Sequence, residues 1–162
     1  MTDIIQSDKE ELLAAEDAEI RRCADAALVL IRFSANSRKM LEEKLVKRGY
    51  AKNIVQIALN NLEKGGFIND KALLCAHAYR LATVKCYGKY RIRLELNRKF
   101  HKETVAKYID CALEDVNFEE NAEKLANKYE ANGLEFVIAK LRRNGYTIQE
   151  IRYAVRNIKD TK

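Results

Sequence analysis

A seven-residue motif occurs twice in this sequence and limits the possible folds more than any other feature. It reads KLVKRGY at residues 44–50 and KLRRNGY at residues 140–146. Glycine adopts a left-handed backbone conformation without a Cβ clash, so it commonly follows the last residues of a helix. Each copy is therefore predicted to end one helix at its glycine and to begin the next helix directly afterwards.

The residues around each glycine fit this kind of helix end. In the first copy, Leu45 and Tyr50 lie at the two positions whose side chains usually pack together across a glycine such as Gly49. The second copy is followed by Thr147 and Glu150, which form a capping box typical of a helix start. That copy contains the same three residue types, as Leu141, Gly145 and Tyr146.

Apolar residues recur at helical spacing on both sides of each turn. The two sets correspond at one offset of 96 residues, which is too long for a single helical hairpin and predicts a further copy between them. Residues 87–113 supply this copy, with Ile92 and Leu96 before the turn and Phe100 at the aromatic position. Because no glycine precedes Phe100, we expect Lys99 or Phe100 to form a different, tighter helix end.

The middle copy also permits another interpretation. Its segment YRIRLEL, residues 90–96, alternates strictly between polar and apolar residues, which on its own is typical of a β-strand. The correspondence with two clearly helical copies favours a helix instead. We therefore predict a helical conformation for residues 86–100.

Each predicted hairpin is preceded by one more apolar-periodic segment, at residues 23–33, 70–86 and 118–131. The chain contains no proline and only six glycines, whereas a β-sandwich or barrel needs more turn residues. These observations predict an all-α protein in which every repeat contains three helices.

The predicted architecture is an elongated, curved array of three tandem three-helix repeats, because units of this size bury little surface alone and must pack on their neighbours. An acidic N-terminal extension precedes them, and Ser7 with Glu10 forms a capping box that predicts the start of an extra helix. The predicted boundaries are residues 1–20 for the extension and 21–66, 67–116 and 117–162 for the repeats.

Charge is distributed unevenly along the chain. Residues 1–20 contain seven acidic residues and one lysine, while the whole chain has a net charge of +6, so the remainder carries +12. A strongly basic body suggests a polyanion or an acidic protein surface as the partner. A solvated surface with a bias toward lysine is the alternative.

Residues 85–102 contain seven basic residues and one acidic residue, with Tyr87 and Tyr90 interleaved. Basic side chains beside aromatic rings are suited to follow a phosphate backbone and to stack on bases. The alternative is a solvated helix face whose tyrosines belong to the core. A smaller cluster consists of Arg142 and Arg143. The basic residues of the longer segment are Lys85, Lys89, Arg91, Arg93, Arg98, Lys99 and Lys102.

Other classes of site find no support in the sequence. The four cysteines form no CxxC pair and are expected to be free thiols, and neither a metal site nor a cofactor is predicted. No nucleophile elbow, phosphate loop or HExxH motif occurs, so the chain is not expected to be an enzyme. No apolar run is long enough for a membrane span, and the N-terminus resembles neither a secretory nor a transit peptide.

The order and spacing of these segments resemble the RecX family of bacterial recombination regulators. The resemblance is carried by SRKMLEEKLVKRGY, LEKGGFINDKALLCAHAYR, YGKYRIRLELNRKF and KLRRNGYTIQEIRYAV, and it covers the chain from about residue 23 onward. The sequence departs from the family pattern at Leu73, where an aromatic residue is common, in lacking a glycine before Phe100, and in lacking a proline after Gly88. The acidic extension lies outside the resemblance.

The resemblance implies a regulatory protein without enzymatic activity. Members of this family bind the RecA recombinase in the groove of its filament on single-stranded DNA, and they suppress its ATPase, strand-exchange and coprotease activities in DNA repair and the SOS response. A helical-repeat protein that acts directly on single-stranded or duplex DNA is the alternative, because many DNA-binding proteins also use helix–turn–helix pairs. In both cases we expect a cytoplasmic monomer.

Overall fold

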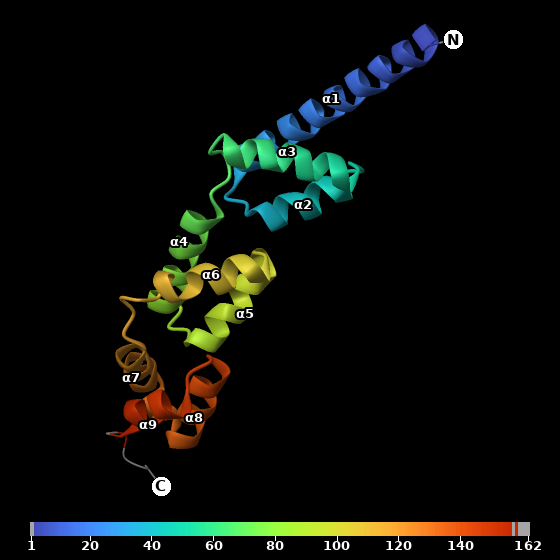
Figure 1. Cartoon of the computed structure of the whole chain (residues 1–162). Coiled ribbons are helices and arrows are strands. Elements are labelled where there is room, and N and C mark those ends of the chain that lie inside the picture. The colour runs from blue at the N-terminus through green and yellow to red at the C-terminus, as the bar shows by residue number, and fades with distance from the viewer. Residues whose placement is uncertain (1, 157, 159–162) are drawn as a thin grey trace. The chain divides into compact units, whose positions relative to one another are not determined.

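The computed structural model describes residues 2–156 and 158, with side chains described from residue 13 onward. Every regular element in this part of the chain is a helix, which confirms the predicted all-α fold (Figure 1). None of these helices is long and apolar enough to cross a lipid bilayer. The chain divides into two compact units, residues 1–70 and residues 71–162.

The first unit consists of α1 (Thr2–Phe33) and a hairpin formed by α2 (Arg38–Lys47) and α3 (Lys52–Lys64). α1 packs against both helices of the hairpin, and its residues Cys23 and Ala27 are fully buried there. The rest of this core comes from the loop residue Ile68, which follows α3, and from the hairpin residues Leu41, Leu45, Ile54, Val55, Ala58, Leu59 and Leu62.

α1 is one continuous helix, so the acidic extension and the first helix of the first repeat are not separate elements (Figure 1). The prediction that a helix starts at Ser7 is wrong, because α1 begins at Thr2. No glycine or proline occurs between residues 2 and 33, and this stretch is rich in glutamate, leucine and alanine, which are good helix formers. Without a breaker residue, a capping box alone does not start a new helix.

The second unit contains two groups of three α-helices within its described residues. α4 (Asp70–Thr83), which begins at the last residue of the first unit, forms one hydrophobic cluster with α5 (Lys89–Lys99) and α6 (Lys102–Ala112). The second group shares another cluster and includes a short 3-10 helix, Glu130–Asn132. Its helices are α7 (Phe118–Tyr129), α8 (Leu134–Arg143) and α9 (Ile148–Val155).

The ambiguous segment at residues 90–96 is helical, as the repeat correspondence predicted, but residues 86–88 of the predicted helix form a loop instead. Ile92 and Leu96 are fully buried, so their spacing of four serves a helix and the strict alternation is incidental. The helix ends at Lys99, and the next residue, Phe100, has an extended backbone (φ −121°) and donates its N–H to the Leu96 carbonyl at 2.8 Å. The middle turn therefore contains no residue with a left-handed backbone conformation.

The two glycine turns have the predicted backbone geometry. Gly49 has φ 98° and Gly145 has φ 83°, both in the left-handed region. In each turn the tyrosine N–H donates to the leucine carbonyl at 3.3 Å, which is the long hydrogen bond of the Schellman motif. A third turn of this type follows α3, where Gly66 has φ 77° and the Phe67 N–H donates to the Leu62 carbonyl at 2.9 Å.

These turns differ in what surrounds them. A Cβ atom added to Gly49 or Gly66 would meet nothing within 4 Å, whereas one added to Gly145 would lie 2.3 Å from the backbone nitrogen of Arg91. We expect Gly145→Ala to lower the free energy of unfolding by about 2 kcal/mol or more, because it adds overpacking to left-handed strain.

Gly49→Ala and Gly66→Ala are the matched controls for this prediction. They introduce only the left-handed strain and should each cost about 1 kcal/mol. Urea titrations followed by circular dichroism measure all three variants. Equal losses in the three would contradict the close backbone contact at Gly145.

Candidate binding surface

The basic segment predicted from the sequence lies mainly on α5. Its cations lie on the sides of this helix that face solvent, and the remaining face is buried through Ile92 and Leu96. Arg91 is half-buried, and Lys85 is exposed in the loop that precedes the helix. The two arginines of the smaller cluster, Arg142 and Arg143, are exposed in the last turn of α8. The exposed cations on α5 itself are Lys89, Arg93, Arg98 and Lys99.

Lys89 takes part in an ion pair that joins the two helices of its hairpin. Its ammonium group lies 2.8 Å from a carboxylate oxygen of Asp110 on α6. The hydrogen bond from Lys89 lowers the pKa of Asp110, and the positive charges of Lys89 and Arg93 act in the same direction. Exposed ion pairs contribute little to stability. This one, however, offsets part of the positive charge that Lys89 could present to a partner.

Arg38 occupies the same place in the first unit as Lys89 does in the second. It begins α2 one residue after the N-cap, and its guanidinium group donates to side chains on α3. The distances are 2.8 Å to Gln56, 2.7 Å to Asn60 and 2.7 Å to Glu63. Because Asn60 and Asp110 correspond in the repeats, both hairpins use a basic first residue to bridge to the second helix.

Arg91 is held by two neighbours on its own side of α5. Its guanidinium group lies 2.8 Å from Glu95 one helical turn later, and 5.6 Å from the centre of the Tyr87 ring. Tyr87 itself packs against the hydrophobic cluster of α4, α5 and α6. Tyr90, by contrast, is 70% exposed. The two tyrosines of the basic segment therefore differ, and Tyr90 has the accessible ring.

A close backbone contact joins the start of α5 to the turn between α8 and α9. The Gly88 N–H donates to the Asn144 carbonyl at 2.8 Å, and a Cβ atom on Gly88 would lie 2.3 Å from the Gly145 carbonyl oxygen. The two backbones can approach this closely only because both positions are glycine. The contact brings the two predicted basic clusters into one neighbourhood, because Arg91 borders Gly145 and Arg143 precedes the same turn.

Tyr146 completes this junction. It is buried, and its hydroxyl donates to the Cys86 carbonyl at 2.9 Å, while the Asn144 amide donates to the same oxygen at 3.4 Å. Burial raises the pKa of Tyr146 well above its usual range, so the phenol remains a neutral donor. Cys86 adopts φ 49°, the only positive φ at a non-glycine residue in the described chain.

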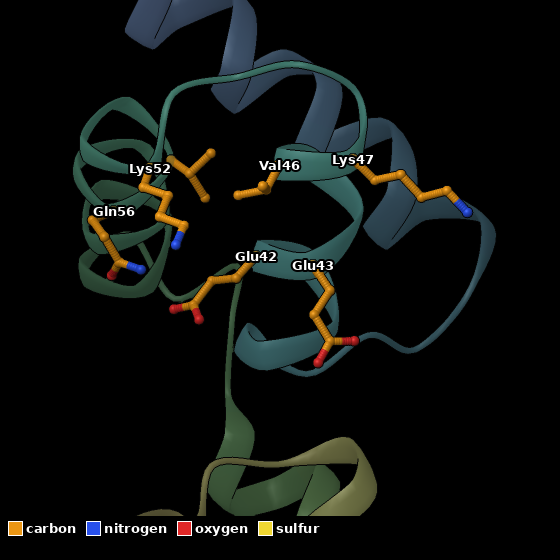
Figure 2. Close-up of a pocket in the computed structure, with 7 residues that line it drawn as sticks. Glu42, Glu43, Val46, Lys47, Lys52 and Gln56 are labelled. Atoms are coloured by element: carbon orange, nitrogen blue, oxygen red, sulfur yellow. The ribbon is translucent and has the colours of Figure 1, made fainter.

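The hairpin of the first unit carries a hollow between its helices (Figure 2). Val46 from α2 and Val55 from α3 supply its apolar lining. The polar residues around it carry two negative and two positive charges, and they are Glu42, Glu43, Lys47, Lys52 and Gln56. In the described chain, no group of three or more His, Cys, Asp or Glu side chains is placed to hold a metal ion.

Removal of one hydroxyl tests the junction at Tyr146. We expect Tyr146→Phe to lower the free energy of unfolding by about 1 kcal/mol, because the partly buried Cys86 carbonyl loses its shorter hydrogen bond. Tyr50→Phe is the control, since the Tyr50 hydroxyl makes an exposed contact of 3.4 Å with the Arg22 carbonyl. Urea unfolding should show a clearly smaller loss for the control, and equal losses would count against the junction.

The fold and this surface define an all-α protein of successive helix triplets with a basic face on its second unit. No protein-family model matches the sequence. A protein named Regulatory protein RecX from Clostridium botulinum (strain Alaska E43 / Type E3) is 30% identical over 126 residues, which cover 78% of this chain and 58% of that protein. Regulatory protein RecX from Chlorobium phaeobacteroides (strain BS1) is 29% identical over 99 residues, covering 61% of this chain and 64% of that protein.

The fold of this chain is also similar to that of solved RecX structures. The crystal structure of RecX from Lactobacillus salivarius has a TM-score of 0.68 at 21% identity, covering 88% of this chain and 97% of that one. A second crystal structure, of regulatory protein RecX, has a TM-score of 0.79 at 18% identity, covering 93% and 78%. The chain belongs to the RecX family of regulatory proteins. It spans less than two thirds of the length of the curated relatives that it matches.

Proposed function

We propose that this protein regulates the RecA recombinase by binding its filament on single-stranded DNA. The proposed effect is a lower ATPase activity, with less strand exchange and less coprotease activity. The observation that carries the proposal is that the chain belongs to the RecX family, and its curated relatives are named Regulatory protein RecX. RecA is named as the partner because the sequence segments resemble the RecX family, whose members bind RecA.

The basic face of the second unit supports this proposal. A filament of protein on single-stranded DNA offers phosphates and acidic side chains, and clustered arginine and lysine residues attract both. The cations proposed to contact the partner are those predicted from the sequence, which lie on or near α5 and at the end of α8. They are Lys85, Lys89, Arg91, Arg93, Arg98, Lys99, Arg142 and Arg143.

The proposed role is binding in the cytoplasm by a monomer, without turnover of a substrate. Successive helix triplets suit this role, because each one presents side chains from equivalent positions to a partner that itself repeats. The rival function is direct binding of DNA without RecA. The exposed ring of Tyr90 among cations is the observation that favours this rival.

RecA ATPase activity on single-stranded DNA tests the proposal. We expect the protein to lower this activity when it is far less abundant than RecA, because a protein that blocks filament growth affects many subunits at once. Steady-state ATP hydrolysis, measured during a titration, gives the dependence on protein concentration. Electron microscopy of the same samples should show shorter filaments.

An unrelated ATPase that depends on single-stranded DNA serves as the control for this titration. A plain DNA-binding protein inhibits both ATPases equally, and only at concentrations that coat the DNA. Equal inhibition would therefore support the rival function. Hydrolysis of ATP by the protein alone would contradict both functions.

A further inference from the structure

The N-terminal part of α1 extends past the hairpin of its own unit (Figure 1). Among the described side chains of this helix, Ile20 is the first apolar one that packs against the hydrophobic core of the first unit. Residues 13–18 are all exposed. We name residues 2–20 of α1 the acidic arm, because residues 1–20 contain seven acidic residues and one lysine.

The apolar side of α1 continues from the core into the acidic arm. Leu13 lies about two helical turns before Ile20, so the two side chains share one side of the helix. Leu13 is nevertheless 54% exposed. Glu16 and Asp17 follow it by three and four residues, which places one carboxylate on each side of this apolar stripe. The described part of the arm therefore presents an exposed leucine with acidic edges.

α5 has the opposite charge pattern on its exposed side. Tyr90 and Leu94 are one helical turn apart on the side away from the buried pair of this helix, and Leu94 is 49% exposed. Helical geometry places Arg93 on one side of them and Arg98 on the other, and both arginines are exposed. We name these four residues the Tyr90 face. Arg98 also lies 3.1 Å from Glu95, but its side chain remains 63% exposed, and exposed ion pairs of this kind are weak.

We propose that the acidic arm of one copy of this chain binds the Tyr90 face of a second copy. Leu13 of the arm packs against Tyr90 and Leu94. The carboxylates on the two sides of Leu13 lie against Arg93 and Arg98. Each surface thus offers an apolar centre between two charges, and the charges of the two surfaces are opposite in sign.

Charge favours this pairing over two others that the chain offers. Two arms repel each other, because residues 1–20 carry a net charge of −6 in each copy. The hollow of the first hairpin gives an acidic helix no net attraction, since its two acids balance its two lysines. The Tyr90 face provides both apolar contact and positive charge, as surfaces that bind amphipathic helices do.

The continuity of α1 favours a second copy as the partner. The arm is the N-terminal part of one unbroken helix whose C-terminal part is fixed in the core of the first unit. It therefore cannot fold back as a flexible tail could, whereas another molecule can approach its exposed sides.

Self-association of this kind covers two of the cations proposed to contact RecA. When the arm of another copy occupies Arg93 and Arg98, these side chains are withheld from the filament, so the monomer is the form that binds RecA. This consequence rests on the proposed function. The self-association itself does not, and it can be measured without RecA.

Sedimentation velocity of the whole protein tests the proposal. At low salt, we expect the average mass to rise above that of the monomer as the protein concentration increases. High salt should return the protein to the monomer, because it screens the charges of the arm and the face. A protein that stays monomeric at every concentration at low salt would overturn the proposal.

An exchange of charge between the two surfaces identifies the contact. The arm variant Glu16→Lys/Asp17→Lys should weaken self-association at least about tenfold, because like charges then face each other. The face variant Arg93→Glu/Arg98→Glu should weaken it similarly. An equal mixture of the two variants should associate again, since the lysines of one meet the glutamates of the other. A mixture that remains monomeric would contradict the assigned contact.

Matched variants separate the two surfaces from overall charge. Glu114→Lys/Asp115→Lys changes the net charge as the arm variant does, at exposed residues outside both surfaces. Lys107→Glu/Lys124→Glu does the same for the face variant. Each control should change the dissociation constant by less than about threefold. Circular dichroism shows whether every variant remains helical. A control that weakens self-association as much as its matched variant would overturn the proposal.

The apolar part of the contact has its own measurement. Leu94→Ala should weaken self-association about tenfold, because a central packing side chain is lost, while the salt dependence stays unchanged. Val84→Ala is the control, since Val84 is exposed and lies outside the Tyr90 face. Equal dissociation constants for these two variants would overturn the docking of the arm on this face.

The two proposals remain distinguishable in every case. If RecA is inhibited but the protein is monomeric at every concentration, the contact between arm and face is wrong and the proposed function stands. If the variants and their mixture behave as expected but RecA is unaffected, the self-association stands and the proposed function fails.

Discussion

Burial of two apolar side chains, one helical turn apart, holds the first helix of every hairpin in place. These helices have only 10 or 11 residues, and isolated helices of that length are marginal in water. Each pair therefore provides the stabilisation that helix propensity alone does not, because it packs against the second helix of the hairpin. Since only one face of the helix is committed to this task, the opposite face can change its chemistry from one repeat to the next.

The sequence was sufficient to predict the helices and their order, because both follow from local patterns. Glycine after an apolar periodic segment predicted the ends of α2 and α8, and the repeat correspondence identified α5 against a strong strand pattern. Ser7 shows where such reasoning fails. A capping box is a local signal, and it does not start a new helix in a stretch that contains no glycine or proline.

The side-chain contacts of the candidate surface were beyond reach of the sequence alone. Nothing in the order of residues indicates that Lys89 pairs with Asp110, because that contact exists only after α5 and α6 have packed. The approach of Gly88 to Gly145 is equally non-local, since these residues are far apart in the chain.

The conformation of Cys86 couples the two helix triplets of the second unit. A positive φ costs a non-glycine residue free energy, and here the Cys86 carbonyl is held by Tyr146 and Asn144 from the following triplet. The loop before α5 and the turn after α8 therefore stabilise each other. In the language of one-dimensional lattice models, this contact is a nearest-neighbour interaction between the last two repeats.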